Sequence, residues 1–199
     1  MRVLASLVLL AFLAACATVP AGPQASDEAI AQQAFRADGP ATLTLITMVN
    51  NRTQSGGHTA LMINGSQRVI FDPAGSFRNE RVLRRDDVLY GIRPAVLQAY
   101  RSAHARAAFH IVSQTVEVSP ETAERAIRLA IARGRVASAL CASSTVELLR
   151  QLDGFQEISS TLFPKRLMES FATLPGVETE KYFEDDEGTI VDGIAKVDL

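Results

Sequence analysis

The chain has 199 residues, 47% of them hydrophobic and 21% charged, a composition that is typical of a globular protein and excludes a disordered one. Its formal net charge of −2 argues against a nucleic-acid-binding surface. The sequence shows no cysteine or histidine cluster with metal-ligand spacing and no glycine-rich phosphate loop, so we expect neither a metal nor a cofactor.

The first sixteen residues have the pattern of an export signal. A positive start is followed by an apolar run to residue 13, which is shorter than the roughly 20 residues that span a bilayer. The run ends in Leu-Ala-Ala-Cys16, which resembles the lipobox of bacterial lipoproteins. The resemblance implies a signal peptide over residues 1–15, a lipid on Cys16 and, because Ala17 follows, an outer-membrane location facing the periplasm. The alternative is an ordinary signal peptide cleaved at a small-residue site.

Residues 16–40 are expected to link this anchor to a single domain over residues 41–199. Residues 17–24 form a polar tether that contains proline and glycine. Ser26 is a suitable N-cap for a short helix that reaches about Arg36.

The next residues predict a strand and then a hairpin. Residues 42–49 alternate and are rich in β-branched side chains, and residues 58–63 and 68–72 flank an Asn-Gly turn signal. A two-residue turn would place His58 opposite Phe71 and next to Asp72, so imidazole and carboxylate can meet at one end of the hairpin. Taken separately, His58 is more simply explained as a surface residue or a satisfied hydrogen-bonder, and Asp72 as a turn former.

The remaining elements predict an α+β fold with an antiparallel sheet packed on helices. A short strand is expected near residues 86–91, a helix over 94–106 and a long strand over 108–118. Ser119 and a following proline begin a helix that runs to about residue 133. A helix from about residue 163 and a last strand over 177–183 follow. His104 and His110 are alternatives to His58, but their places in an arginine-rich helix and in mid-strand favour structural roles.

Cys141 lies in the first turn of a predicted helix, near the positive end of its dipole. Leu148 and Leu152 recur at helical spacing behind it and give the helix an apolar face. Unpaired N–H groups at a helix start favour the thiolate, which is the nucleophilic form of cysteine. If Cys16 carries lipid, Cys141 has no disulfide partner within the chain. The alternative is a small buried apolar residue, which free cysteine usually is.

The order of these features resembles the circularly permuted branch of the NlpC-type papain-like superfamily, which includes lecithin:retinol-acyltransferase-like proteins and small bacterial envelope hydrolases. The matching features are Gly-His58-Thr-Ala-Leu on an early strand, a polar residue after the next strand and a later helix that begins at Cys141. The proline-led segment 163–167 also resembles a helix of that group, and the match covers roughly residues 43–183. Leu140 departs from the pattern, because relatives often carry a polar residue before the cysteine, and Asp72 stands where a histidine is usual.

The resemblance implies a papain-like core in circularly permuted order, with Cys141 as nucleophile, His58 as base and Asp72 orienting the imidazole. It implies hydrolysis or transfer at amide or ester bonds, either of peptidoglycan stem peptides or of acyl groups on lipids and lipoproteins. The partners expected are the membrane, through the anchor, and such a substrate, with no nucleic acid.

Two other interpretations stay open. A non-catalytic lipoprotein that uses the same fold for binding or assembly would bury Cys141 away from any imidazole. A plain structural domain would place His58 and Cys141 far apart, whereas the enzyme requires sulfur and ring nitrogen within about 3–4 Å.

Overall fold

The computed structural model describes residues 24–75 and 77–184. The predicted signal peptide and the predicted lipid attachment residue Cys16 lie outside these residues. Among the described residues, no helix is long and apolar enough to cross a membrane.

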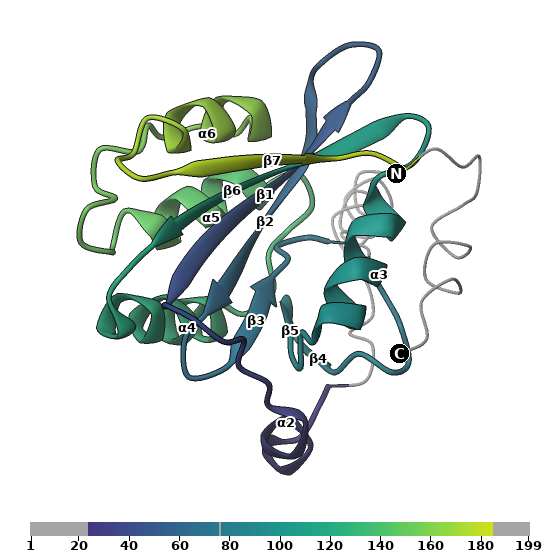
Figure 1. Cartoon of the computed structure of the whole chain (residues 1–199), viewed down its shortest axis with the longest axis vertical. Helices are drawn as coiled ribbons and strands as arrows, with labels where there is room; N and C mark the ends of the chain where they lie inside the picture. The colour runs from purple at the N-terminus through teal and green to yellow at the C-terminus, as the bar shows by residue number, and fades with distance from the viewer. Residues whose placement is uncertain (1–23, 76, 185–199) are drawn as a thin grey trace, which may run out of the picture.

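The fold is α+β, as predicted, and consists of one seven-stranded antiparallel sheet with helices on both faces (Figure 1). The strand order is β4-β5-β3-β2-β1-β6-β7. The strands are β1 (Thr42–Asn50), β2 (Gly56–Asn64), β3 (Arg68–Phe71), β4 (Arg84–Arg85), β5 (Val88–Leu89), β6 (Phe109–Glu117) and β7 (Glu178–Tyr182). The helices are α2 (Asp27–Gln33), α3 (Pro94–His104), α4 (Pro120–Arg133), α5 (Cys141–Leu149) and α6 (Pro164–Phe171).

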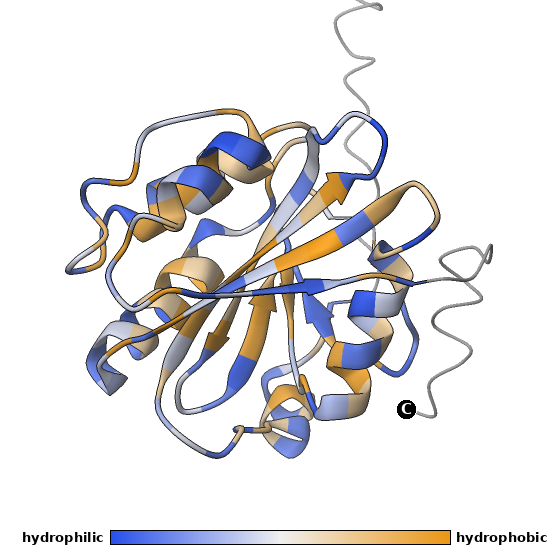
Figure 2. Cartoon of the chain, turned by 45° about the horizontal axis from the view of Figure 1, so that its top comes forward, coloured by the Kyte–Doolittle hydropathy of each residue, from blue (hydrophilic) through white to orange (hydrophobic). Residues whose placement is uncertain are grey.

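The two faces of the sheet carry two separate apolar layers, since successive side chains of a strand point to opposite faces. Leu43 and Leu45 of β1 join the layer beneath α4, α5 and α6. Ile46 and Met48 of the same strand join the layer beneath α3. The central strands are therefore hydrophobic on both sides, and Figure 2 shows many hydrophobic residues along their ribbons. Both flanking helix groups are held by burial of apolar surface.

The hairpin between β2 and β3 corrects the predicted register. Asn64 pairs with Arg68, so three residues form the loop, and Leu61 rather than His58 lies opposite Phe71. The reason is that the Asn64 side chain is committed elsewhere: its Oδ1 accepts from the Ala37 N–H at 3.0 Å. Asn64 is buried against the preceding segment and cannot serve as an exposed turn residue.

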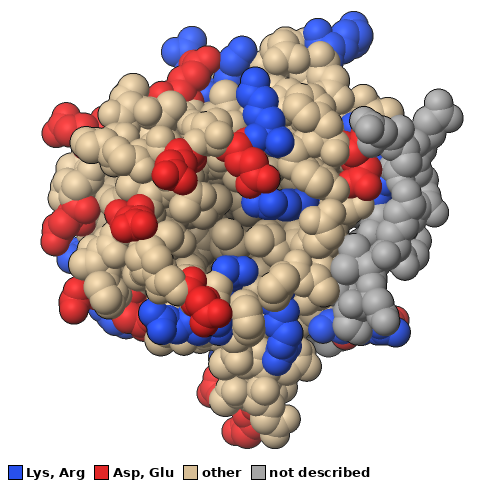
Figure 3. All heavy atoms as spheres, in the orientation of Figure 1, with Lys and Arg blue, Asp and Glu red and all other residues tan. Residues whose placement is uncertain are grey.

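On the face shown in Figure 3, acidic and basic side chains are interspersed, and no extended area carries one sign of charge. This agrees with the small net charge of −2, and it gives no electrostatic preference for a polyanion on that face.

Candidate active site

The residues predicted from the sequence come from three elements that meet at one end of β2. His58 is the third residue of β2, Asp72 follows directly after β3, and Cys141 is the first residue of α5. His58 and Asp72 lie on the side of the sheet covered by α3, whereas Cys141 arrives on α5 from the opposite side.

The meeting point exists because β3 is shorter than β2. The β2–β3 ladder ends at the pair Leu61 and Phe71, so the first residues of β2 have no β3 partner. This open stretch leaves the backbone N–H of Thr59 free to donate a hydrogen bond to the Cys141 sulfur. Cys141 therefore approaches β2 beyond the end of its ladder with β3.

A bulge in β2 precedes His58. Met48 of β1 pairs with His58 and Val49 pairs with Gly56, so Gly57 is the extra residue. A Cβ at Gly57 would lie 2.7 Å from the Phe109 ring, and only glycine fits there without displacing that ring. Bulges redirect neighbouring side chains, and this one precedes the imidazole.

His58 is hydrogen-bonded on both sides of its ring. Its Nε2 donates to Oδ1 of Asp72 at 2.8 Å, which leaves Nδ1 for the hydrogen bond to the Cys141 thiol. The His58 side chain is 19% exposed, whereas Cys141 is buried with 7% exposure. The structure thus brings all three predicted residues into one hydrogen-bonded chain.

The pKa values of the chain favour an ion pair between the thiolate and the imidazolium. Burial by itself disfavours the charged form of His58, but the hydrogen bonds to Asp72 and Cys141 outweigh it and raise its pKa to about 10. Burial also opposes ionisation of Cys141, yet the bond to His58 lowers the thiol pKa below its usual value. The proton is therefore held on the ring while the sulfur carries the negative charge.

Asp72 is fully enclosed and fixed by two donors on the same oxygen. Its Oδ1 accepts from His58 and also from the Tyr100 hydroxyl at 2.9 Å, while its Oδ2 is buried without a partner among the described residues. Burial would raise the pKa of this carboxyl, but the bond and the charge of His58 outweigh it and lower the pKa. A Cβ at Gly75 would lie 1.8 Å from Oδ2, so the carboxylate occupies the space that glycine leaves.

Helix α3 supplies two further side chains: Tyr100, which the sequence did not mark as functional, and His104, which was considered as an alternative to His58 and expected to be structural. Tyr100 holds Asp72, and the ring of His104 is stacked 6.3 Å from that of His58. His104 Nδ1 donates to the Tyr100 carbonyl at 2.8 Å, and burial lowers the His104 pKa, which keeps this ring neutral. The polar spacing of Tyr100 and His104 on one helix face was the available signal. His110 lies apart and bonds Asn51.

The start of α5 brings backbone donors to the sulfur. The Ala142 N–H contributes to the lowered pKa of Cys141, and the N–H of Cys141 itself is at a helix terminus, where no intrahelical acceptor exists. Ala139 has φ 68°, a conformation that L side chains rarely adopt, and it turns the chain into the helix two residues before the thiol.

Within residues 24–75 and 77–184, no group of three or more His, Cys, Asp or Glu side chains is placed to hold a metal ion. What the arrangement offers chemically is a nucleophile with an adjacent base and an oriented carboxylate.

Comparison with known proteins finds no family model, no curated protein and no solved structure that matches this chain. Any function must therefore be inferred from the geometry of the site.

Proposed function

We propose that this protein is a thiol hydrolase or acyltransferase in which Cys141 attacks the acyl carbon of an amide or ester. The observation that carries the proposal is the hydrogen-bonded chain Cys141–His58–Asp72, in which the imidazole is bonded on both sides. A nucleophile, a base and an orienting group in this order define nucleophilic acyl chemistry on many folds.

In the acylation step the Cys141 thiolate adds to the carbonyl carbon, and the carbonyl electron pair moves to oxygen. In this proposal the backbone N–H of Cys141, at the start of α5, stabilises that oxyanion, an effect worth about 2.7–4 kcal/mol per donor. The His58 imidazolium then gives its proton to the leaving amine or alcohol as the carbon–nitrogen or carbon–oxygen bond breaks. The product is a thioester on Cys141, with neutral His58 still bonded to Asp72.

In the second step a water molecule or another acceptor attacks the thioester. Neutral His58 takes the proton of the acceptor as it adds, and the thiolate leaves as the acid or new acyl product is released. The imidazolium–thiolate pair is thereby restored, and the atoms and charges of the cycle balance.

We extend the proposal to the fold and the location. The strand of His58 precedes the helix of Cys141 in the chain, which is the order expected of a circularly permuted papain-like core of the NlpC type. The lipobox-like Leu-Ala-Ala-Cys16 supports a lipoprotein of the outer membrane that faces the periplasm. Peptidoglycan stem peptides and the acyl groups of lipids or lipoproteins are then the amides and esters within reach.

The test is the rate of Cys141 alkylation by iodoacetamide as a function of pH, in the wild type and in His58→Ala. We expect the wild-type rate to titrate well below pH 8.5, the ordinary thiol value, because the pKa of Cys141 is lowered. His58→Ala removes the main partner of the thiolate and should return the titration toward that ordinary value.

His110→Gln is the matched control, since His110 bonds Asn51 and is not part of the chain; its profile should equal that of the wild type. Two results would refute the catalytic proposal and leave a binding or assembly lipoprotein. In one, Cys141 is not alkylated until the protein unfolds; in the other, the pH dependence of alkylation is the same in the wild type and in His58→Ala.

A further inference from the structure

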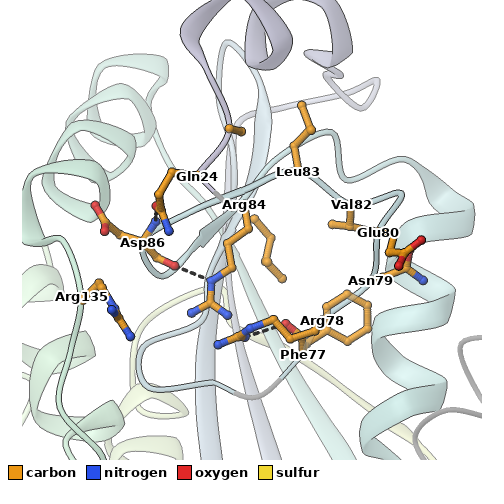
Figure 4. A pocket seen from close by; sticks show the side chains of 12 residues that line it. Gln24, Phe77, Arg78, Asn79, Glu80, Val82, Leu83, Arg84, Asp86 and Arg135 are labelled. Carbon is orange, nitrogen blue, oxygen red and sulfur yellow. Dashed lines mark hydrogen bonds between the residues drawn. The ribbon is translucent and has the colours of Figure 1, made fainter. Parts of the chain in front are cut away.

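A cavity of about 610 Å³ lies apart from the proposed catalytic residues, since none of Cys141, His58 and Asp72 lines it. It is enclosed by the segment 77–83, by β4 and by the residues that lead into α2 and α5 (Figure 4). Its volume is within the range of about 300–1,000 Å³ of small-molecule sites.

The walls of this cavity have two chemistries. One part is apolar and is formed by Phe77, Val82, Leu83 and Leu89. The other part carries three arginines, Arg78, Arg84 and Arg135, whose side chains extend into the same region of Figure 4. Glu80 and Asp86 also line the cavity, but in Figure 4 their carboxylates point away from the guanidinium groups.

Arg84 has a buried hydrogen-bond donor that lacks a partner among the described residues. Its Nη2 donates to Asp87 Oδ1 at 2.6 Å, and its Nε donates to the Asp86 carbonyl. Its Nη1 is buried and has no partner among the described residues. Asp87 cannot supply that partner, because its other oxygen already accepts from the N–H groups of Ala74 and Val136.

Arg78 adds positive charge that no carboxylate neutralises in the contacts described. Its Nη1 donates to the carbonyls of Gly75 and Phe77, which are neutral acceptors. A guanidinium fixed by carbonyls, beside a second one with a buried unmet donor, suits the two oxygens of a carboxylate or phosphate. The apolar wall next to it suits a hydrocarbon chain.

We propose that this cavity binds an anionic amphiphile, with its carboxylate or phosphate on the guanidinium groups of Arg78 and Arg84 and its chain against Phe77 and Leu89. The carboxylate could belong to a fatty acid and the phosphate to a lipid fragment, and the shared chemistry is one anionic group on one apolar chain. The site is independent of the catalytic chain proposed above.

The experiment is calorimetric titration of the full chain with four probes: hexanoate, hexyl phosphate, hexanol and inorganic phosphate. We expect at least one of the two anionic amphiphiles to bind at least tenfold more tightly than both hexanol and inorganic phosphate. Tighter binding of hexanoate identifies a carboxylate ligand, and tighter binding of hexyl phosphate a phosphate ligand. Equal binding of hexanol, equal binding of inorganic phosphate, or no binding at all would overturn the proposal.

The variant Arg78→Gln locates the site, because Arg78 is exposed and its replacement leaves the buried Arg84–Asp87 pair intact. It should lose at least tenfold in affinity for the preferred probe. Arg128→Gln, an exposed position on α4, is the control and should bind like the wild type. An Arg78→Gln variant that binds like the wild type places the probe elsewhere and refutes the assignment.

Cys141→Ser separates this proposal from the catalytic one. It should bind the preferred probe as the wild type does, so a failed test of catalysis leaves the binding result standing. If Cys141→Ser binds at least tenfold more weakly, the probe occupies the catalytic chain and the cavity is not its site.

Discussion

At the scale of single residues, His58 determines what the site can do. Its two ring nitrogens serve different partners, a carboxylate at 2.8 Å and a thiol, and the carboxylate is itself held by Tyr100. The protonation states of Asp72, His58 and Cys141 are therefore coupled, although the three side-chain types have well-separated pKa values in water. The charge on the sulfur depends on the proton on the ring, and the proton on the ring depends on Asp72.

Asp72→Asn should change the pH profile of hydrolysis, followed with p-nitrophenyl acetate. In the wild type we expect kcat/KM to rise as pH passes the lowered pKa of Cys141 and to fall near pH 10 as His58 loses its proton. The amide removes the charge that favours the imidazolium, so the pKa of His58 decreases and the falling limb moves to lower pH. We expect kcat/KM to decrease by about 10²-fold or more.

The matched control is Asp153→Asn at an exposed turn position, which should leave the profile unchanged. An Asp72→Asn profile with the falling limb still near pH 10 would show that Asp72 does not set the charge of the ring.

Gly75→Ala should disturb Asp72 without touching His58 or Cys141. The added Cβ would lie 1.8 Å from Oδ2 of a carboxylate whose Oδ1 is fixed by two donors, so the turn must shift. We expect a loss of about 1–3 kcal/mol in the free energy of unfolding and slower alkylation of Cys141. Urea denaturation and iodoacetamide rates measure the two effects.

Ala74→Gly is the control for that turn, because Ala74 has φ 57°, which glycine adopts without strain. It should unfold at the same or higher urea concentration than the wild type. Equal losses in both variants would show that turn flexibility, not the contact with Asp72, is responsible.

At the scale of elements, the site depends on how two loops are tied to β5. Asp87 precedes β5, and its backbone carbonyl accepts from the Asp72 N–H at 2.7 Å. Its Oδ2 accepts from Ala74, after Asp72, and from Val136, in the segment that leads to Cys141. One buried carboxylate thus fixes both the turn after Asp72 and the segment that leads to Cys141.

Asp87→Asn should therefore destabilise the fold strongly. The amide leaves Arg84 without its charged partner and presents N–H donors to backbone N–H groups. Breaking a buried ion pair in this way costs about 3–5 kcal/mol, to be measured as a shift of the urea midpoint.

Asp86→Asn, at the neighbouring position, is the matched control. The Asp86 carboxylate makes no hydrogen bond or ion pair with another described residue, and we expect its replacement to change the free energy of unfolding by less than about 0.5 kcal/mol. Equal stability of the two variants would contradict this role.

Element boundaries were predictable where one residue carries the signal, and not where partners are distant. Ser119 caps α4 as its sequence indicates, and the helix spans Pro120–Arg133. The Asn64 turn was predicted with the wrong length, because its side chain bonds a segment 27 residues earlier. Tyr100 was not assigned to the site for a related reason: its spacing from His104 marks one face of α3, but its contact with Asp72 depends on how that helix packs.

At the scale of the whole molecule, the sheet carries helices on both faces and the site lies between them. The α+β class and the antiparallel sheet followed from alternation and capping signals, since these depend on local spacing. The juxtaposition of His58 and Cys141 depends on the long-range arrangement of β2 and α5. It was suggested by the resemblance in chain order and not by composition or periodicity.

The proposed anchor is tested by Cys16→Ser. The wild type should incorporate a labelled fatty acid and sediment with membranes, because acylation at the lipobox adds the apolar chain that holds the domain there. The variant should lose the label and leave the membrane fraction, while Cys141 keeps its alkylation profile. A wild type that carries no label, or a variant that keeps it, would favour the ordinary signal peptide.

The open end of β2 has a consequence for when the protein becomes reactive. In the unfolded chain Cys141 is an ordinary thiol with a pKa of about 8.5, because Thr59, His58 and the first turn of α5 are not yet around it. The helices of both faces must close on the sheet before those partners meet at the sulfur. The lowered pKa of Cys141 is therefore a property of the folded protein, and an unfolded chain presents only an ordinary thiol.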